Sequence, residues 1–170
     1  ENFTPGSEDD DAVAVACKAD NIEWLLPLKS LVAGADDGVY VLEASEEGAI
    51  TPSDVAANLN SNVQVSGVTP IITSHSLIFA GRARTHLYEA GYKIEADSVV
   101  ANQLDLLSDH LTRGKIKETA YQQDPHGIVW CVTDEGELFS MTYQPAHEVV
   151  GFAPHTSPFS AIFVSVAAIP

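Results

Sequence analysis

Apolar and polar residues alternate in short runs over residues 116–152, and turn residues separate these runs. The first run, Ile116–Gln122, alternates loosely, and Ile128–Val132 is continuously apolar with several β-branched residues. Leu138–Tyr143 alternates again, and Glu148–Phe152 is the fourth run. Gly, Pro and Asp residues occupy the gaps. Short runs separated by such turns predict an antiparallel meander of four strands.

Comparable runs occur upstream, and the Asp-Gly pair at residues 37–38 is a strong hairpin signal between two of them. We expect strands at Ala12–Cys17, Ile22–Leu26, Leu31–Gly34, Val39–Leu42, Val63–Val65, Val68–Thr73, Ser76–Gly81 and Thr85–Tyr88.

Two segments carry helix signals. Thr51–Asp54 resembles a helix start, so Val55–Leu59 is either a short helix or an extended connection between sheets. Leu104, Leu107 and Leu111 have helical spacing. They predict one short amphipathic helix over about 102–111, at the edge of two sheets.

One pattern repeats along the chain. Ser30–Gly34, Ser76–Ala80 and Gly127–Cys131 take the same place in three successive hairpins, 46 and then 51 residues apart. A period of about 40–50 residues with several strands per unit is typical of β-propeller blades. The predicted fold class is therefore all-β, with antiparallel four-stranded meanders as β-propeller-like blades.

The predicted blades cover approximately residues 12–60, 63–97 and 116–152, and residues 159–170 would form the first strand of a further blade. A propeller needs about four blades or more to close. We therefore expect residues 1–170 to be a fragment of a larger β-propeller-like domain.

The formal net charge is −16, from 24 acidic and 8 basic residues. Residues 1–60 hold 13 acidic and 2 basic residues. This charge would repel a phosphate backbone, which argues against specific binding of nucleic acid. The acidic residues are either solvated loops or the wall of a passage that polyanions cross without adsorbing. No apolar run approaches the roughly 20 residues that a membrane helix needs, so no membrane span is expected.

The residues with metal-binding chemistry show no metal-binding spacing. Asp9, Asp10 and Asp11 lack the pattern of a calcium loop. The two cysteines, Cys17 and Cys131, make neither a disulfide framework nor a zinc site, and Cys131 is expected in the core. Of the six histidines, His126, His147 and His155 could meet in space. The other three are His75, His86 and His110.

A hydrolase would need a nucleophile, a base and an acid. Ser74, His75 and Ser76, together with Asp109 and His110, suggest such a set, but no Gly-x-Ser-x-Gly motif or Gly-rich phosphate loop is present. The aromatic residues Trp24, Trp130, Phe139 and Tyr143 are expected in the core. The sequence thus predicts no enzyme, and no catalytic, cofactor-binding or metal-binding residue.

An ordered set of residues over about 22–170 resembles the tail nozzle or tail tubular family of short-tailed bacteriophages. The resemblance is carried mainly by Asn102–Leu111, Ala120–Val132, Asp134–Leu138, Met141–Tyr143, His147–Phe152 and His155–Thr156. Upstream, pieces in the same order are Ile22–Leu25, Leu31–Gly34, Gly48–Pro52 and Leu77–Phe79.

This resemblance implies a propeller-containing structural protein of the virion, located in the phage tail. It implies a ring of several copies, such as a hexamer, with neighbouring tail proteins as partners and DNA as passing cargo. The alternative from a different class is a propeller-type module that binds or hydrolyses a glycan or a peptide.

Overall fold

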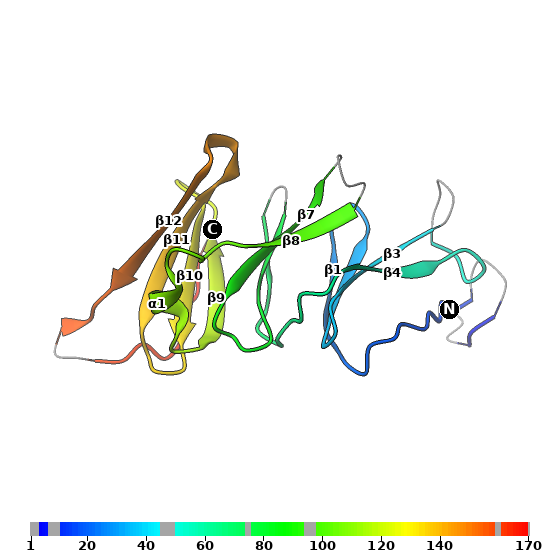
Figure 1. Cartoon of the computed structure of the whole chain (residues 1–170), viewed down its shortest axis with the longest axis horizontal. Coiled ribbons are helices and arrows are strands. Elements are labelled where there is room, and N and C mark those ends of the chain that lie inside the picture. The colour runs from blue at the N-terminus through cyan, green and yellow to red at the C-terminus, as the bar shows by residue number, and fades with distance from the viewer. Residues whose placement is uncertain are drawn as a thin grey trace. The chain divides into compact units, whose positions relative to one another are not determined.

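The computed structural model describes residues 4–6, 11–44, 50–73, 76–93, 98–158 and 161–169. Within these residues the chain forms three four-stranded antiparallel sheets, and in each the strands are neighbours in chain order (Figure 1). This confirms the predicted all-β class and the four-stranded meanders. The chain divides into two compact units, Glu1–Val65 and Ser66–Pro170. Closure into a propeller stays a prediction.

The first unit holds one sheet. Its strands are β1 (Ile22–Pro27), β2 (Leu31–Ala35), β3 (Val39–Glu43) and β4 (Ala56–Ser61). The predicted Asp-Gly hairpin joins β2 to β3, and its turn is closed by hydrogen bonds between Ala35 and Gly38. A Cβ at Gly34 would lie 2.2 Å from the ring of Trp24, so glycine is what lets this indole pack flat on β2.

In the first unit, two expected strands are absent among the described residues and one of two open alternatives is excluded. Residues Ala12–Cys17 and Val63–Val65 form no strand; Ala12 makes only an isolated bridge to Pro5. The helix considered at Val55–Leu59 is β4, which pairs antiparallel with β3. Its apparent cap is a tight turn in which the Asp54 N–H donates to the Thr51 carbonyl. Asn and Val are weak helix formers, and pairing with β3 therefore decides the conformation.

The second unit holds two sheets. The first consists of β5 (Ile71–Ile72), β6 (Leu77–Ala80), β7 (Leu87–Lys93) and β8 (Ser98–Gln103). The second consists of β9 (Ile116–Gln122), β10 (Ile128–Thr133), β11 (Leu138–Gln144) and β12 (Val149–His155), with the 3-10 turn η1 (Pro145–His147) before β12. The meander predicted over residues 116–152 is confirmed, and its last strand extends three residues further than expected.

The two sheets of the second unit share one hydrophobic core. One face of β10 and β11 packs against residues of β5–β7 and the chain before them. Fully burying a large apolar side chain, such as Phe139 or Met141, stabilises the folded state by roughly 1.5–3 kcal/mol. Cys131 is fully buried here, as predicted. The cluster contains Val68, Ile71, Ile78, Ala80, Leu87, Ile116, Val129, Cys131, Phe139, Met141 and Tyr143.

The one short helix that was predicted is present among the described residues, but its predicted bounds of about 102–111 are wrong for most of that range. Strand β8 runs to Gln103, the Leu104 N–H still donates to the Leu87 carbonyl, and only Asp109–Thr112 is helical, as α1. Leu104 and Leu111 pack against the core, whereas Leu107 is 93% exposed. The Ser108 N–H donates to the Asp105 carbonyl, and the Asp105 carboxylate accepts a hydrogen bond from Thr112 Oγ1. The chain therefore makes a turn before α1 instead of continuing as a helix. No helix within the described residues is long and apolar enough to cross a membrane.

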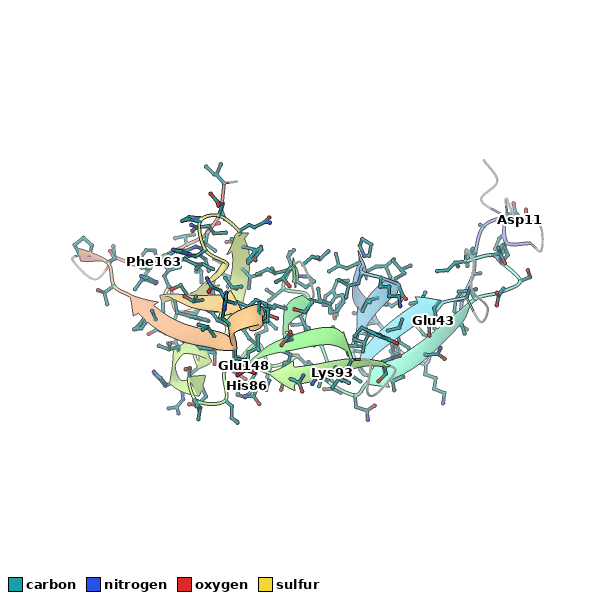
Figure 2. The ribbon with its side chains drawn as sticks, turned by 90° about the horizontal axis from the view of Figure 1, so that it is seen from above. Asp11, Glu43, His86, Lys93, Glu148 and Phe163 are labelled. Carbon is teal, nitrogen blue, oxygen red and sulfur yellow. The ribbon has the colours of Figure 1, made fainter. Side chains whose placement is uncertain are left out.

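The strand expected over 159–170 is also wrong for the part that the structure describes, residues 161–169. This segment is nevertheless tied to the last sheet. The Phe163 N–H (residue labelled in Figure 2) donates to the Gly136 carbonyl, and Lys117 Nζ donates to the Val164 carbonyl. The Val166 N–H donates to Glu118 Oε2 at 3.1 Å. These partners are a turn and two side chains rather than a strand backbone, so no ladder forms.

Candidate functional site

The last three histidines lie in three different elements. His126 lies in the turn before β10, His147 ends η1, and His155 ends β12. Among the described residues, no three His, Cys, Asp or Glu side chains come together in a way that could hold a metal ion. His75 and two of the three early aspartates, Asp9 and Asp10, lie outside the described residues.

The residues considered for a hydrolase are engaged elsewhere. Ser74 and His75 lie outside the described residues. The Ser76 hydroxyl lies 2.8 Å from Tyr143 Oη in the core. Asp109 pairs with Arg113 at 3.3 Å on the surface of α1. The Ser76 hydroxyl and the Asp109 carboxylate therefore have partners that stabilise the fold.

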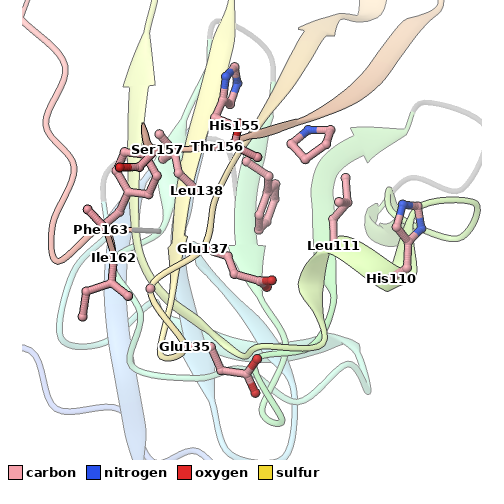
Figure 3. Close-up of a pocket in the computed structure, with 14 residues that line it drawn as sticks. His110, Leu111, Glu135, Glu137, Leu138, His155, Thr156, Ser157, Ile162 and Phe163 are labelled. Atoms are coloured by element: carbon pink, nitrogen blue, oxygen red, sulfur yellow. The ribbon is translucent and has the colours of Figure 1, made fainter. Parts of the chain in front are cut away.

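A cavity of about 430 Å³ lies around the β10–β11 hairpin (Figure 3). His110 and Leu111 of α1 stand on one side of the hairpin, and Ile162 and Phe163 of the C-terminal segment stand on the other. Its apolar wall continues into the core. The remaining lining residues are Glu135, Gly136, Glu137, Leu138, Phe139, Pro154, His155, Thr156, Ser157 and Ala161.

The rim of this cavity is acidic. Glu135 and Glu137 are both exposed, and Glu137 extends from the hairpin toward Leu111 (Figure 3). The hairpin itself is held by Thr133, whose N–H donates to the Glu137 carbonyl and whose Oγ1 accepts from the Glu137 N–H. Carboxylates beside an apolar wall suit a small ligand with a basic group and an apolar body.

Ser140 and His155 form a contact that the sequence did not reveal. Ser140 Oγ lies 2.8 Å from His155 Nε2, and the His155 ring lies 5.0 Å from the ring of Trp130. Trp130 is only half-buried, on the face of the sheet opposite the core, so its predicted place in the core is wrong. Its Nε1 donates to Gln122 Oε1 at 3.1 Å. Trp24, Phe139 and Tyr143 are buried as predicted.

Within the described residues, no acid is positioned to orient the second nitrogen of His155. A serine–histidine pair without such an acid lacks the arrangement of a hydrolase triad. The pair joins neighbouring strands, because Ser140 on β11 faces Ala153, two residues before His155. Ser140 lies on a predicted strand, but His155 lies three residues past the predicted end of the next one, so the sequence carries no signal for this pair.

A second polar group missed in the sequence is Asp105, which is fully buried. Its Oδ2 accepts from Thr112 Oγ1 at 2.9 Å and lies 3.2 Å from His86 Nδ1. Gln103 Nε2 lies 3.0 Å from the same His86 nitrogen. These contacts fasten the turn before α1 to β7, which gives the cluster a structural role.

Polar side chains also cross the core between the two sheets. Tyr143 Oη on β11 donates to Glu89 Oε1 on β7 at 2.5 Å. Burial, followed by the hydrogen bond to Glu89, raises the pKa of the Tyr143 phenol well above its ordinary value. At the end of the sheets, Arg84 makes two contacts with the Asp134 carboxylate, at 3.2 and 2.6 Å.

A comparison of the chain with models of known protein families and with curated protein sequences found no match.

Proposed function

We propose that this chain is part of a structural protein of a bacteriophage tail, the nozzle or tail-tube ring through which DNA passes, and that it performs no catalysis. One observation supports this proposal above the others. The chain folds into successive four-stranded meanders, two of which share a core, and its residues over 22–170 resemble that family in their order. Stacked meanders offer broad sheet faces and edges for contacts between subunits.

The environment of the polar residues fits a structural role. Ser76, Glu89 and Tyr143 join two sheets, and Asp105 fastens a turn. In an enzyme we would expect such groups to converge on a cavity with perturbed pKa values. Here the strongest polar contacts hold secondary-structure elements together instead.

The partners in this proposal are other copies of the chain, neighbouring tail proteins and, as passing cargo, DNA. Acidic side chains would keep DNA from adsorbing, because adsorption depends on basic side chains that release counterions from phosphates. The described acidic residues of the first unit are all at least partly exposed: Asp11, Asp20, Glu23, Asp36, Asp37, Glu43 and Asp54.

The experiment that tests the proposal is the mass of the purified chain in solution, by light scattering over a range of protein and salt concentrations. The proposal predicts a closed assembly of several copies with one defined mass. A chain that remains monomeric under all these conditions would contradict it. Double-stranded DNA added to the assembly should not bind at physiological salt.

A second candidate function is the binding of a small molecule or peptide side chain, and the cavity beside Glu135 and Glu137 is the observation that favours it. A panel of glycans and basic peptides tests this function by their effect on the melting temperature. A stabilising compound whose effect is lost in Glu137→Gln but kept in Glu148→Gln would support binding in the cavity. Loss of the effect in both variants, or no effect at all, would rule it out.

A further inference from the structure

Strand β12 is the last strand of its sheet, and no described strand pairs with its outer side (Figure 1). All seven residues of Val149–His155 pair with β11, so the strand is long and regular. It contains no Asp, Glu, Lys or Arg, although 32 of the 170 residues of the chain are charged. Val149 and Val150 are each 42% exposed. Exposed edge strands are normally protected by charges, and an uncharged one is suited to pairing.

The register shows which backbone groups of β12 point outward. The Tyr143 N–H donates to the Gly127 carbonyl, so the backbone of Tyr143 faces β10. In an antiparallel sheet this direction alternates from residue to residue. Thr142 and its neighbours at every second position therefore face β12, and their partner Gly151 directs its backbone toward β11.

It follows that Val150 and Phe152 direct their N–H and C=O groups away from the sheet. These two residues flank Gly151 symmetrically. Pro154, the next residue facing outward, has no N–H and so limits pairing on that side. The outer edge of β12 therefore offers two complete pairing positions centred on one glycine.

Gly151 has no role within the described fold that requires a glycine. A Cβ at this position would meet no described atom within 4 Å, and its φ is not positive. By contrast, a Cβ would come within 3.0 Å of another atom at Gly6, Gly34, Gly38, Gly114, Gly127 and Gly136. Glycine weakens a strand, and one of its uses there is to allow close approach of another backbone.

We propose that β12 pairs antiparallel with β12 of a second copy of this chain, about a two-fold axis at Gly151. Val150 then lies opposite Phe152 of the partner subunit, and the two equivalent pairs exchange four backbone hydrogen bonds. Gly151 faces Gly151 of the partner subunit at a position where Cα atoms come within about 4.5 Å. The pairing covers Val150, and two acidic chains meet along strands that carry no charged side chain.

This pairing does not depend on the proposed function. A two-fold contact is closed by two copies and produces a dimer, whereas a ring with cyclic symmetry needs a different, head-to-tail contact. The dimer and the ring can therefore be established or lost separately.

A residue on a two-fold axis faces itself, and this gives a test specific to the proposed partner. We expect the wild-type chain to form dimers in sedimentation experiments at about 0.15 M salt or above, where repulsion between the acidic chains is screened. Gly151→Lys and Gly151→Glu should each shift the chain to monomer, because like charges directly opposite each other destabilise a strand pair. An equimolar mixture of the two variants should restore the dimer. Leu107→Lys and Leu107→Glu, at a fully exposed turn, should leave dimerisation unchanged.

Cysteine cross-linking gives a second, independent measurement. In a Cys17→Ser background, Gly151→Cys should form a disulfide-linked dimer under mild oxidation, since a Cα separation of about 4.5 Å lies within the range that disulfides tolerate. Leu107→Cys in the same background is the control. Cross-linking no faster than in this control would contradict the pairing.

The remaining outcomes also decide the matter. A wild-type chain that stays monomeric, charged variants that still dimerise, or a mixture that fails to restore the dimer would each overturn the pairing. Rings whose mass is the same in Gly151→Lys as in the wild-type chain would remove this inference and leave the proposed function standing. A dimer that is lost in Gly151→Lys and Gly151→Glu, and that never forms larger assemblies, would support the pairing and contradict the proposed function.

Discussion

Tyr143 of β11 donates a hydrogen bond of 2.5 Å to Glu89 of β7, and this pair joins the two sheets of the second unit through their shared core. Tyr143 is also in hydrogen-bond contact with Ser76, next to β6. A polar link through an apolar core fixes how two sheets align, because the partners are satisfied only in one arrangement.

Removing the phenolic hydroxyl of Tyr143 tests this link between the two sheets. Tyr143→Phe removes the Tyr143 partner of the Glu89 carboxylate and one of the two hydroxyl partners of Ser76, which keeps Thr73 Oγ1 at 3.1 Å. Loss of a hydrogen bond to a buried polar group costs about 1–3 kcal/mol. We expect the free energy of unfolding in urea to fall by about that amount. A double-mutant cycle with Glu89→Gln should give a coupling of about 1 kcal/mol or more. Additive effects of the two substitutions would contradict a direct interaction.

The raised pKa of Tyr143 predicts that the folded state becomes less stable at alkaline pH. The folded state raises the pKa of Tyr143 above 10.0, and the hydrogen bond to Asp37, followed by burial, raises that of Tyr40 to about 12. Above pH 10 the unfolded chain therefore releases protons that the folded chain retains, so the free energy of unfolding falls as the pH rises. Tyr143→Phe should make this fall less steep in urea titrations between about pH 9 and 12. An identical slope in both proteins would contradict the assignment.

The leucines of residues 102–111, the segment predicted to be helical, should differ in how much they stabilise the fold. Leu111 packs against the core, whereas Leu107 is exposed. Leu111→Ala should lower the free energy of unfolding by about 2 kcal/mol. Leu107→Ala should change it by less than about 0.5 kcal/mol. Equal losses would indicate the regular amphipathic helix that the leucine spacing suggested.

The C-terminal segment should detach from the sheet in acid. Hydrogen bonds from Ser165 and from the Val166 N–H lower the pKa of Glu118. A lowered pKa means that this contact is present above the ordinary pKa of 4.5 and is lost as the pH falls through the folded-state value. Protection of the Val166 amide from hydrogen exchange should therefore decrease as the pH falls through the folded-state pKa of Glu118.

Glu118→Gln is the matched variant, because it keeps the shape of the side chain without its charge. It should reduce the protection of Val166 at neutral pH and remove the dependence on acid. Unchanged protection in this variant would show that the carboxylate does not hold the segment.

Strands could be predicted from the sequence where apolar and polar residues alternate regularly and turn residues bound the run. The meander β9–β12 followed from alternation interrupted by turn residues at both ends of each run. Strand β4 did not, because Ala and Asn in Ala56–Ser61 give little signal and pairing with β3 decides their conformation. The leucines near α1 have helical spacing, yet a turn held by buried Asp105 places them differently.

The contacts within candidate sites depend on register, which the sequence did not provide. Ser140 reaches His155 only because β11 and β12 align as they do. The outward direction of the Val150 and Phe152 backbone is likewise a consequence of that alignment. A one-residue shift would reverse both.

The proposed role in a phage tail is tested most directly by electron microscopy of the assembled chain in negative stain. The proposal predicts class averages with a ring of several copies around a central opening wide enough for duplex DNA. Particles without an opening, whether monomers or compact two-fold dimers, would contradict it.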